Sequence, residues 1–245
     1  MLFFIHKYIM NTAQFENIIN GYIVNSNNEN EFKINGVKIS SSDMKPIKIK
    51  TDNETNSRRN IREISIPKDS PNFLKPFMFD HNRHIKYVDY YPKESMPKYC
   101  FANSNIDVVD APNITLIENG TFMNCKKLSC VYSDNVKVIS SKAFDGCSNL
   151  FDVRYNSELI QIGDYAFRNS GIISFYIPDS ITTIGQGIFE KCSKLKHIYM
   201  SKYIYEKYFK NNDEWAYIGL DKSKWHYNIN SCSNKNQYEI EFIKN

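Results

Sequence analysis

The sequence has 245 residues, of which 42% are hydrophobic, 24% are charged and 14% are aromatic. A chain this rich in aromatic residues can bury a core, which excludes a largely disordered protein. The formal net charge is only +4, so electrostatics gives no argument for binding to nucleic acid or to an anionic membrane. No apolar run approaches the roughly 18 residues that a membrane-spanning helix needs, and membrane insertion is therefore not expected.

The first 60 residues carry no repeat and are predicted to form an N-terminal cap or a small β-hairpin region with a linker. A short amphipathic helix is expected over residues 12–20. Apolar and polar residues alternate around Asn35-Gly36, the strongest short-range signal of a hairpin, so we predict a β-hairpin over residues 31–40. The polar stretch Thr51–Asn60 has no periodicity, which is typical of a loop.

Six phenylalanines recur through the middle of the chain at intervals of 22, 21, 22, 23 and 22 residues. They are Phe79, Phe101, Phe122, Phe144, Phe167 and Phe189. The clearest turns share the pattern L-x-x-I-x-I-P, then V-x-x-I-G, then A-F-x-x-C, as in Ile172–Cys192. A fixed period of this length predicts a solenoid, in which stacked turns bury each other's apolar faces.

Each part of the repeat predicts a local structure. The alternating L-x-x-I-x-I stretch predicts a strand with one buried face. Gly163 and Gly185 are expected to allow a tight bend through positive φ, and A-F-x-x-C is predicted to form about one helical turn that points Phe and Cys inwards. The expected fold over residues 61–200 is a repeat solenoid with a parallel β ladder of about seven strands on one face, and short helical turns and loops elsewhere.

This pattern closely resembles the BspA-type leucine-rich repeats, a class found in many bacterial and parasitic-protist surface proteins. The resemblance covers Ile61 to about Met200 and is most specific in the last four strands. It implies a leucine-rich repeat fold and, for many relatives, surface adhesion or binding to host proteins. The chain has only 8 Leu, because Ile, Val, Phe and Tyr occupy most positions that the family name assigns to leucine.

The strand face that points away from the core is the candidate binding surface. One outward column reads Glu63, Tyr87, Val108, Cys130, Asp152, Ser174 and His197, and the other reads Ser65, Asp89, Asp110, Tyr132, Arg154, Tyr176 and Tyr199. Four carboxylates face one arginine, and four tyrosines join them; tyrosine is enriched at protein interfaces. The candidate partner-binding residues are Tyr87, Asp89, Asp110, Tyr132, Asp152, Arg154, Tyr176, His197 and Tyr199. The alternative explanation is that tyrosine is abundant here and suits strands.

Cysteines form another column, at the inward position of successive turns. They are Cys125, Cys147 and Cys192, and together with the six phenylalanines they are expected to form the structural core. Cys130 lies in an outward column and is expected to be exposed, which favours a reducing environment. His81 and His84 have the spacing of a metal pair but no third ligand at a zinc-like distance, so no metal site is expected.

Residues 201–245 are predicted to form a C-terminal cap of a short helix and a strand. Ile204 and Tyr208 lie one helical turn apart, and an alternating strand is expected over residues 238–242. No common catalytic motif occurs in the sequence, so the chain is not expected to be an enzyme and no cofactor is expected. An enzyme with a site near Trp215 and His226 is kept as the alternative from another class.

The expected function is a non-catalytic interaction module that binds a macromolecular partner through the ladder face. The exposed area of that face is on the order of 500 Å², which is below the roughly 800 Å² that each partner buries in a standard protein interface. The expected partner is therefore a protein in a small contact, a peptide or a glycan. The oligomeric state stays open. Neither nucleic acid nor membrane insertion is expected. The alternative is an intracellular scaffold or regulatory subunit, with residues 1–60 docking a second partner. A missing signal peptide and free cysteines favour the cytoplasm, whereas the resemblance suggests the cell surface.

Overall fold

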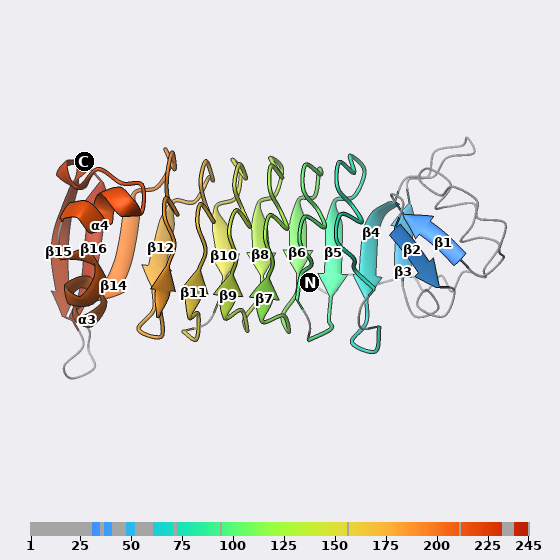
Figure 1. Ribbon diagram of the computed structural model, residues 1–245, viewed down its shortest axis with the longest axis horizontal. Coiled ribbons are helices and arrows are strands. Elements are labelled where there is room, and N and C mark those ends of the chain that lie inside the picture. Colours follow the sequence, from blue (N-terminus) through green and yellow to red (C-terminus); the bar gives the residue numbers. More distant parts are fainter. Residues whose placement is uncertain are drawn as a thin grey trace, which may run out of the picture.

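The computed structural model describes residues 31–34, 37–40, 48–51, 61–70, 73–93, 95–155, 157–210, 212–231 and 238–244. From residue 61 onwards the chain forms an elongated β-solenoid whose turns stack along one axis (Figure 1). This confirms the predicted repeat solenoid with parallel strand ladders.

Seven strands, one per turn, line one side of the solenoid. They are β4 (Ile61–Ile66), β5 (Tyr87–Tyr90), β6 (Val108–Asp110), β8 (Cys130–Tyr132), β10 (Asp152–Arg154), β12 (Ser174–Ile177) and β14 (His197–Ser201). Paired neighbours are parallel and in the predicted register, so that Val109 lies between Val88 and Val131. We call the outward side of these seven strands the ladder face.

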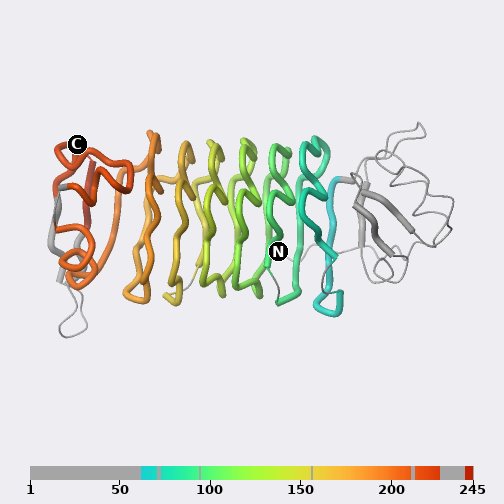
Figure 2. The backbone as a smooth tube through the Cα atoms, in the orientation of Figure 1, coloured from blue at the N-terminus to red at the C-terminus, as the bar shows by residue number. Residues whose placement is uncertain are grey.

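A second, shorter ladder lies in the V-x-x-I part of each turn. It consists of β7 (Leu116–Ile117), β9 (Val138–Ile139), β11 (Gln161–Ile162) and β13 (Thr183–Ile184), all parallel. Met96 extends it by a single bridge to Ile117. The sequence pattern predicted only a bend here. Between β6 and β13 the chain therefore runs along both ladders in every turn before it rises to the next, and Figure 2 shows the course of this backbone.

The six repeat phenylalanines form one continuous stack inside the solenoid. Every one of them is fully buried. Their ring centroids lie 5.4, 5.6, 5.4 and 5.3 Å apart from Phe79 to Phe167, with nearly parallel planes, and 6.3 Å apart between Phe167 and Phe189. Aromatic burial of this extent dominates core energetics, so the stack is the main apolar contact between turns.

The prediction of a helical turn at A-F-x-x-C is wrong. The residues two before and two after each Phe have positive φ, as at Asn103 (57°), Asn124 (58°) and Asn169 (54°). The segment is a succession of tight turns, closed by bonds such as the Cys125 N–H to the Phe122 carbonyl (3.0 Å). An inward Phe and Cys three residues apart fit both geometries, which is why the spacing did not distinguish them. Asn tolerates the left-handed region, and this accounts for part of its abundance.

The expected role of Gly163 and Gly185 is also wrong, because neither has a positive φ. Glycine is needed at these two positions because the backbones of successive turns pack closely there. A Cβ at Gly163 would lie 2.4 Å from the backbone nitrogen of Ser141, and one at Gly185 would lie 2.4 Å from that of Asp164. Glycine is therefore required here for backbone approach and not for a left-handed bend.

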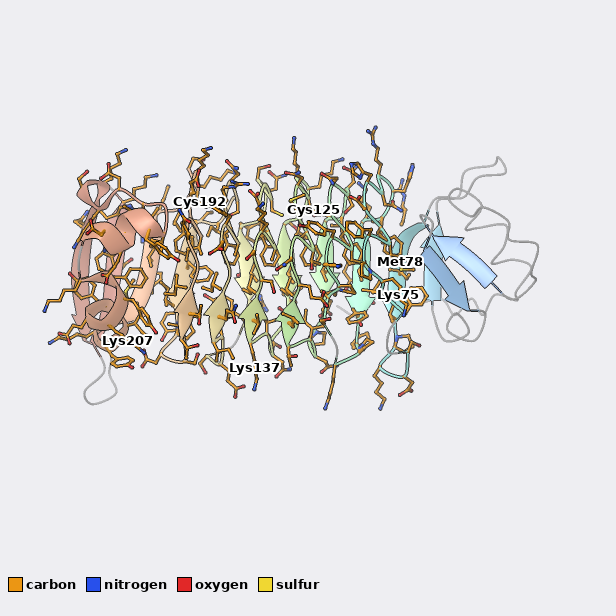
Figure 3. All side chains as sticks on the ribbon, in the orientation of Figure 1. Lys75, Met78, Cys125, Lys137, Cys192 and Lys207 are labelled. Carbon is orange, nitrogen blue, oxygen red and sulfur yellow. The ribbon has the colours of Figure 1, made fainter. Side chains whose placement is uncertain are left out.

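The cysteines of the inward column lie inside the solenoid. Cys125, Cys147 and Cys192 are buried, and each thiol donates to the carbonyl of the Phe in the preceding turn, at 2.9, 3.0 and 3.0 Å. Figure 3 shows Cys125 and Cys192 along the same side of the solenoid. Burial raises the pKa of Cys125 to about 12, so this thiol is protonated at neutral pH. The five described cysteines are free.

The predicted N-terminal hairpin is present. β1 (Glu31–Ile34) and β2 (Val37–Ser40) pair antiparallel. β3 (Lys48–Thr51), which was not predicted, pairs antiparallel with β4 and extends the ladder sheet by one strand. The helix expected over residues 12–20 and most of the predicted loop at 51–60 lie outside the described residues, and the division of the chain at residue 60 stays a prediction.

The C-terminal region contains the predicted short helix and final strand. β14 is followed by α3 (Lys202–Ile204), the π-helical turn η1 (Tyr205–Phe209), α4 (Asn212–Tyr217), the 3-10 turn η2 (Lys222–Lys224), β15 (Trp225–Ser231) and β16 (Tyr238–Lys244). β16 pairs antiparallel with β14 and with β15. α4 and β15 were not predicted, because the sequence reasoning placed only isolated tryptophans there.

Residues at the end of α4 complete the last turn of the solenoid. In earlier turns the Phe167 N–H donates to the Ile188 carbonyl of the following turn. After the last turn, Gly187 and Phe189 donate instead to the carbonyls of Tyr217 (2.7 Å) and Ile218 (3.0 Å). The C-terminal segment thus accepts the hydrogen bonds that a further turn would have accepted, as solenoid ends require.

The ladder face is interrupted at one step, which the repeat pattern did not reveal. β10 ends one sheet and β12 begins another, with no pairing between them, and Figure 1 shows their ribbons further apart than those of β8 and β10. The inward residues are larger here: Phe175 stands where Val109, Val131 and Val153 stand in the preceding turns. Its ring packs edge-on against Phe167 (5.1 Å) and Phe189 (5.2 Å), the pair with the longest stacking distance.

Tyr155 acts together with Phe175 at this step. It stands at the inward position that Ala111 and Ser133 hold in earlier turns, and its ring centroid lies 5.3 Å from that of Phe175. Its hydroxyl donates to the Tyr176 carbonyl, an acceptor on the strand that β10 does not reach. Tyr90 holds the same inward position in β5 and leaves that strand paired on both sides, so a tyrosine alone does not open the ladder. We therefore attribute the separation of the two strands to Tyr155 and Phe175 together.

Replacing Phe144 by Ala tests the stack. We expect a loss of about 3–5 kcal/mol in the free energy of unfolding, because a buried aromatic ring is removed between two others. The matched control is Phe151→Ala, since Phe151 is 54% exposed and its truncation should change stability by less than about 0.5 kcal/mol. Urea unfolding followed by circular dichroism measures both. A loss below about 1 kcal/mol for Phe144→Ala would contradict the proposed core.

Candidate interaction face

The ladder face carries the two outward columns that the sequence predicted. Tyr87 pairs in register with Val108, Asp89 with Asp110, Cys130 with Asp152 and Tyr132 with Arg154. Ser174 pairs with His197 and Tyr176 with Tyr199 beyond the interruption. The columns are therefore continuous on either side of it. The structure divides the nine candidate residues into two groups and a single histidine.

The first group lies on β5 and β6 and is acidic. Tyr87, Asp89 and Asp110 are half-buried neighbours. Burial raises the pKa of Asp110, and the carboxylates of Asp89 and Asp134 raise it further. Burial also raises the pKa of Tyr87, with a hydrogen bond to Asp89 adding to the rise. Carboxylates that repel each other in this way form a surface that is stabilised by a cationic group.

The second group lies around the interruption and mixes aromatic with charged side chains. The Arg154 guanidinium lies 3.5 Å from the Asp152 carboxylate and 4.7 Å from the centroid of the Tyr132 ring. Tyr176 is exposed, and Tyr199 is its half-buried neighbour on β14. The arginine is thus already engaged by an ion pair and a cation–π contact.

The expected exposure of Cys130 is wrong, because only 5% of this residue is accessible. Its short side chain lies between Val108 and Asp152 in the column, and a side-chain hydrogen bond with Cys130 is the main cause that raises the pKa of Tyr132. Larger neighbours therefore cover the thiol. The inference about a reducing environment that rested on this residue no longer stands.

His197 is held by the C-terminal region. Its Nδ1 lies 2.9 Å from Oε1 of Glu241 on β16, and its ring stacks on Tyr199 with centroids 6.1 Å apart. The imidazole therefore links the last repeat strand to the closing strand, a structural contact that sequence spacing alone did not reveal.

A cleft of about 430 Å³ lies at the interruption, and we call it the β10–β12 cleft. Its lining includes Asp134, Asp152, Arg154, Phe175, Tyr176 and Tyr199. Four of these six residues were predicted from the sequence, but the cleft was not, because the repeat pattern implies an unbroken ladder. The available signal was the size of the inward residues Tyr155 and Phe175.

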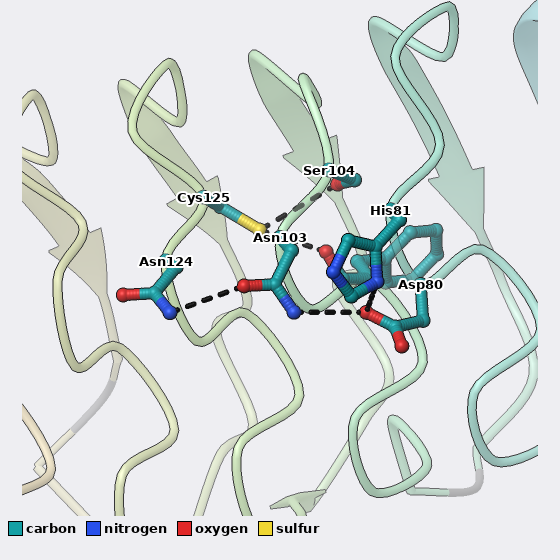
Figure 4. A network of polar contacts seen from close by, with 7 residues as sticks. Asp80, His81, Asn103, Ser104, Asn124 and Cys125 are labelled. Carbon is teal, nitrogen blue, oxygen red and sulfur yellow. Dashed lines mark hydrogen bonds and ion pairs between the residues drawn. The ribbon is translucent and has the colours of Figure 1, made fainter.

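The turns on another edge of the solenoid carry a polar row that Figure 4 shows at close range. Asn124 donates to Asn103 (3.1 Å), which donates to Asp80 (3.0 Å), which lies 2.9 Å from Nδ1 of His81. These residues tie consecutive turns together. Within the described parts of the chain, no group of three or more His, Cys, Asp or Glu side chains could hold a metal ion.

The C-terminal region contains a second, mainly apolar concavity of about 620 Å³ beside Trp225 and His226. Trp215 is fully buried, and its ring centroid lies 6.3 Å from that of Trp225. The Ser223 hydroxyl donates to the Asp221 carboxylate at 2.6 Å, and the Ser223 N–H donates to the same oxygen at 3.1 Å. This is the geometry of a local turn and not of a nucleophile prepared by a histidine, so it gives no support to a catalytic site.

The sequence matches the profile described as BspA type Leucine rich repeat region in six copies, over residues 5–129 and 115–240. The chain belongs to the BspA-type leucine-rich repeat family. Proteins with repeats of this family serve protein interaction and are typically non-catalytic. The resemblance predicted from the phenylalanine spacing is thereby confirmed.

Solved structures of bacterial leucine-rich repeat proteins resemble the BspA-type repeats of this chain. One from Bacteroides ovatus is 20% identical (TM-score 0.39, covering 62% of this chain and 39% of that one), and one from Eubacterium ventriosum is 25% identical (0.42, 59% and 39%). A leucine-rich cell surface protein from Faecalibacterium prausnitzii is 16% identical (0.41, 62% and 54%). The chain thus matches little more than half of these structures at most. No protein of curated function matches it.

No helix within the described ranges has the length and hydrophobicity needed to span a bilayer. The helices of the C-terminal region are short, and α4 is the longest of those described, with 6 residues.

Replacing Asp110 by Asn tests the acidic group of the ladder face. Because the folded-state pKa of Asp110 is raised, its contribution to stability is present below the unfolded pKa and is lost as the pH rises through the folded pKa. We therefore expect the Asn variant to melt at a higher temperature than the parent at pH 7. The difference should shrink as the pH falls and should be largely lost at about pH 3, below the unfolded pKa of about 3.9, where the carboxyl is mostly protonated in both states.

The matched control for this substitution is Asp213→Asn on the exposed surface of α4. Thermal unfolding at pH 7 and pH 3 measures all three proteins. A lower melting temperature of Asp110→Asn at pH 7 would show that the carboxylate makes a stabilising contact and would contradict the repulsion inferred here.

Proposed function

We propose that this chain is a non-catalytic interaction module that binds a protein partner through the ladder face. The observation that carries the proposal is the composition of that face. It has regular columns of carboxylates and tyrosines in register over consecutive strands, and no described helix lies across it (Figure 1). Extended ladders of this kind are the recognition surfaces of repeat proteins.

The energetics of the face support a binding role over a purely structural one. The Asp110 carboxylate sits beside like charges that raise its pKa, which costs stability in the free protein. A cationic partner removes that cost. Tyr87 and Tyr132 add rigid, half-polar contact area, the type that carries binding energy at interfaces.

Capture of partners on the immobilised full chain tests the proposal. The ladder-face variant is Tyr87→Ala with Asp89→Lys. The control is Tyr217→Ala with Asp213→Lys, the same two changes on α4, where Tyr217 is exposed. Extract from cells that express the chain is passed over all three proteins after nuclease treatment, and retained proteins are quantified by mass spectrometry.

We expect at least one protein that the parent and the control retain equally and that the ladder-face variant retains about tenfold less, a loss of about 1.4 kcal/mol in binding free energy. Retention of every partner by the ladder-face variant at the parent's level would overturn the proposal. Circular dichroism of the variants shows that both keep the fold.

The proposed function has two forms, a cell-surface adhesin and an intracellular scaffold, and the location of the protein in the cell distinguishes them. An adhesin is labelled on intact cells by a biotin reagent that does not cross membranes. A scaffold is labelled by the same reagent only after the cells are permeabilised. The buried free cysteines do not decide between them, because none of those described is accessible to oxidant.

A further inference from the structure

The interruption of the ladder leaves two strand edges facing each other. β10 pairs with β8 on one side and β12 pairs with β14 on one side, and neither pairs across the gap. Edge strands present backbone N–H and C=O groups that can pair with a further extended chain. Every other step of the ladder is closed by parallel pairing among the described strands, so this property belongs to one place on the face.

Exposed apolar side chains gather at the same place. Phe151, just before β10, is 54% exposed, and Ile173, just before β12, is 46% exposed. They occupy the same position of consecutive turns, where other turns carry Lys86, Asp107 or Ser129. Tyr176 on β12 is 40% exposed and lines the cleft. Phe151 and Ile173 do not line the cleft themselves, but each directly precedes a residue that does, Asp152 and Ser174 respectively. Exposed apolar residues beside a cleft mark a binding site.

The charge of the β10–β12 cleft selects the kind of partner. Asp134 and Asp152 line it together with one cation, Arg154, which already contacts Asp152 and the Tyr132 ring. Asp134 has no cation within ion-pair distance among the residues that the structure describes. The lining of the cleft therefore has a net negative charge, which complements a lysine or arginine side chain.

We propose that the β10–β12 cleft binds an extended peptide segment of the partner, in which apolar residues alternate with at least one lysine or arginine. The peptide main chain pairs with the edge of β10 that faces the interruption, because on β12 the Tyr176 carbonyl already accepts the Tyr155 hydroxyl. Its apolar side chains contact Phe151, Ile173 and Tyr176, and its basic side chain lies beside Asp134 and Asp152. The inference rests on the proposed function and names the part of the ladder face that determines the choice of partner.

A peptide accounts for more of these features than the other occupants do. A glycan would use Tyr176 and the carboxylates but would leave Phe151, Ile173 and the strand edges without a role. A second copy of this chain would need a projecting extended basic segment. Only an extended peptide matches the open edge of β10, the apolar residues and the negative charge together.

Panning a phage library of random twelve-residue peptides on the immobilised full chain tests the inference. Enriched clones are then measured on four variants. Ser174→Trp fills the cleft from an exposed position on β12, and Asp134→Asn with Asp152→Asn removes its charge. Asp213→Asn is the charge control, and Tyr87→Ala with Asp89→Lys reports on the rest of the ladder face. The same protein is also applied to an array of neutral and acidic oligosaccharides.

We expect enriched peptides to share apolar residues at alternate positions next to Lys or Arg. Their affinity should fall at least tenfold in Ser174→Trp and in the double Asn variant, and should stay unchanged in Asp213→Asn. Three results would overturn the inference: no enrichment, retention of affinity by both cleft variants, or an oligosaccharide whose binding is lost in Ser174→Trp.

The outcomes separate this inference from the proposed function. Peptides lost only in Tyr87→Ala with Asp89→Lys would place recognition on β5 and β6, so that the cleft fails while the ladder face stands. Peptides unaffected by every ladder-face variant would contradict both. Amide spectra recorded for each variant show that lost binding does not come from lost folding.

Discussion

The structure depends on the requirement that each turn bury one phenylalanine against the phenylalanines of its neighbours. No turn of about 22 residues can cover its own apolar face, so a turn is stable only between two others. The stack of rings from Phe79 to Phe189 meets this requirement along the axis. The thiols of Cys125, Cys147 and Cys192 each donate to the carbonyl of the repeat Phe one turn earlier, and so hold successive turns together. Where the repeats end, the carbonyls of Tyr217 and Ile218 take over the bonds that another turn would accept.

The same requirement explains where the ladder opens. Phe175 adds an aromatic ring to a column of valines, and the added ring fits only by packing edge-on between Phe167 and Phe189. Tyr155 fills the adjacent space, and β10 and β12 no longer pair. The second ladder, through β11 and β13, remains paired, so the turns separate on one side only. A change in the size of core residues thus creates a cleft on the ladder face, beside its columns of carboxylates and tyrosines.

The register of both outward columns could be predicted, because a strict repeat places corresponding residues side by side once the strands are parallel. The tight turns around each Phe could not, since an inward Phe and Cys three residues apart satisfy a helical turn equally well. The packing role of Gly163 depends on how closely Ser141 approaches, which one turn's sequence does not contain. The burial of Cys130 likewise depends on its neighbours in adjacent strands. The sequence does contain a signal for the interruption, namely the large side chains of Tyr155 and Phe175. That signal is found by comparing side-chain volumes at the same inward position of successive turns, and not by matching apolar residues to the repeat pattern.

Amide hydrogen exchange, followed residue by residue on the full chain, tests most directly whether these two side chains hold the ladder open. We expect the amides of β10 and β12 that face the interruption to exchange at least about tenfold faster than the paired amides of β6 and β8. The amides beside Phe144 and Phe167 should stay protected, because the stack continues beneath. Equal protection of all four strands would require a continuous ladder, and would contradict both the interruption and the cleft that it forms.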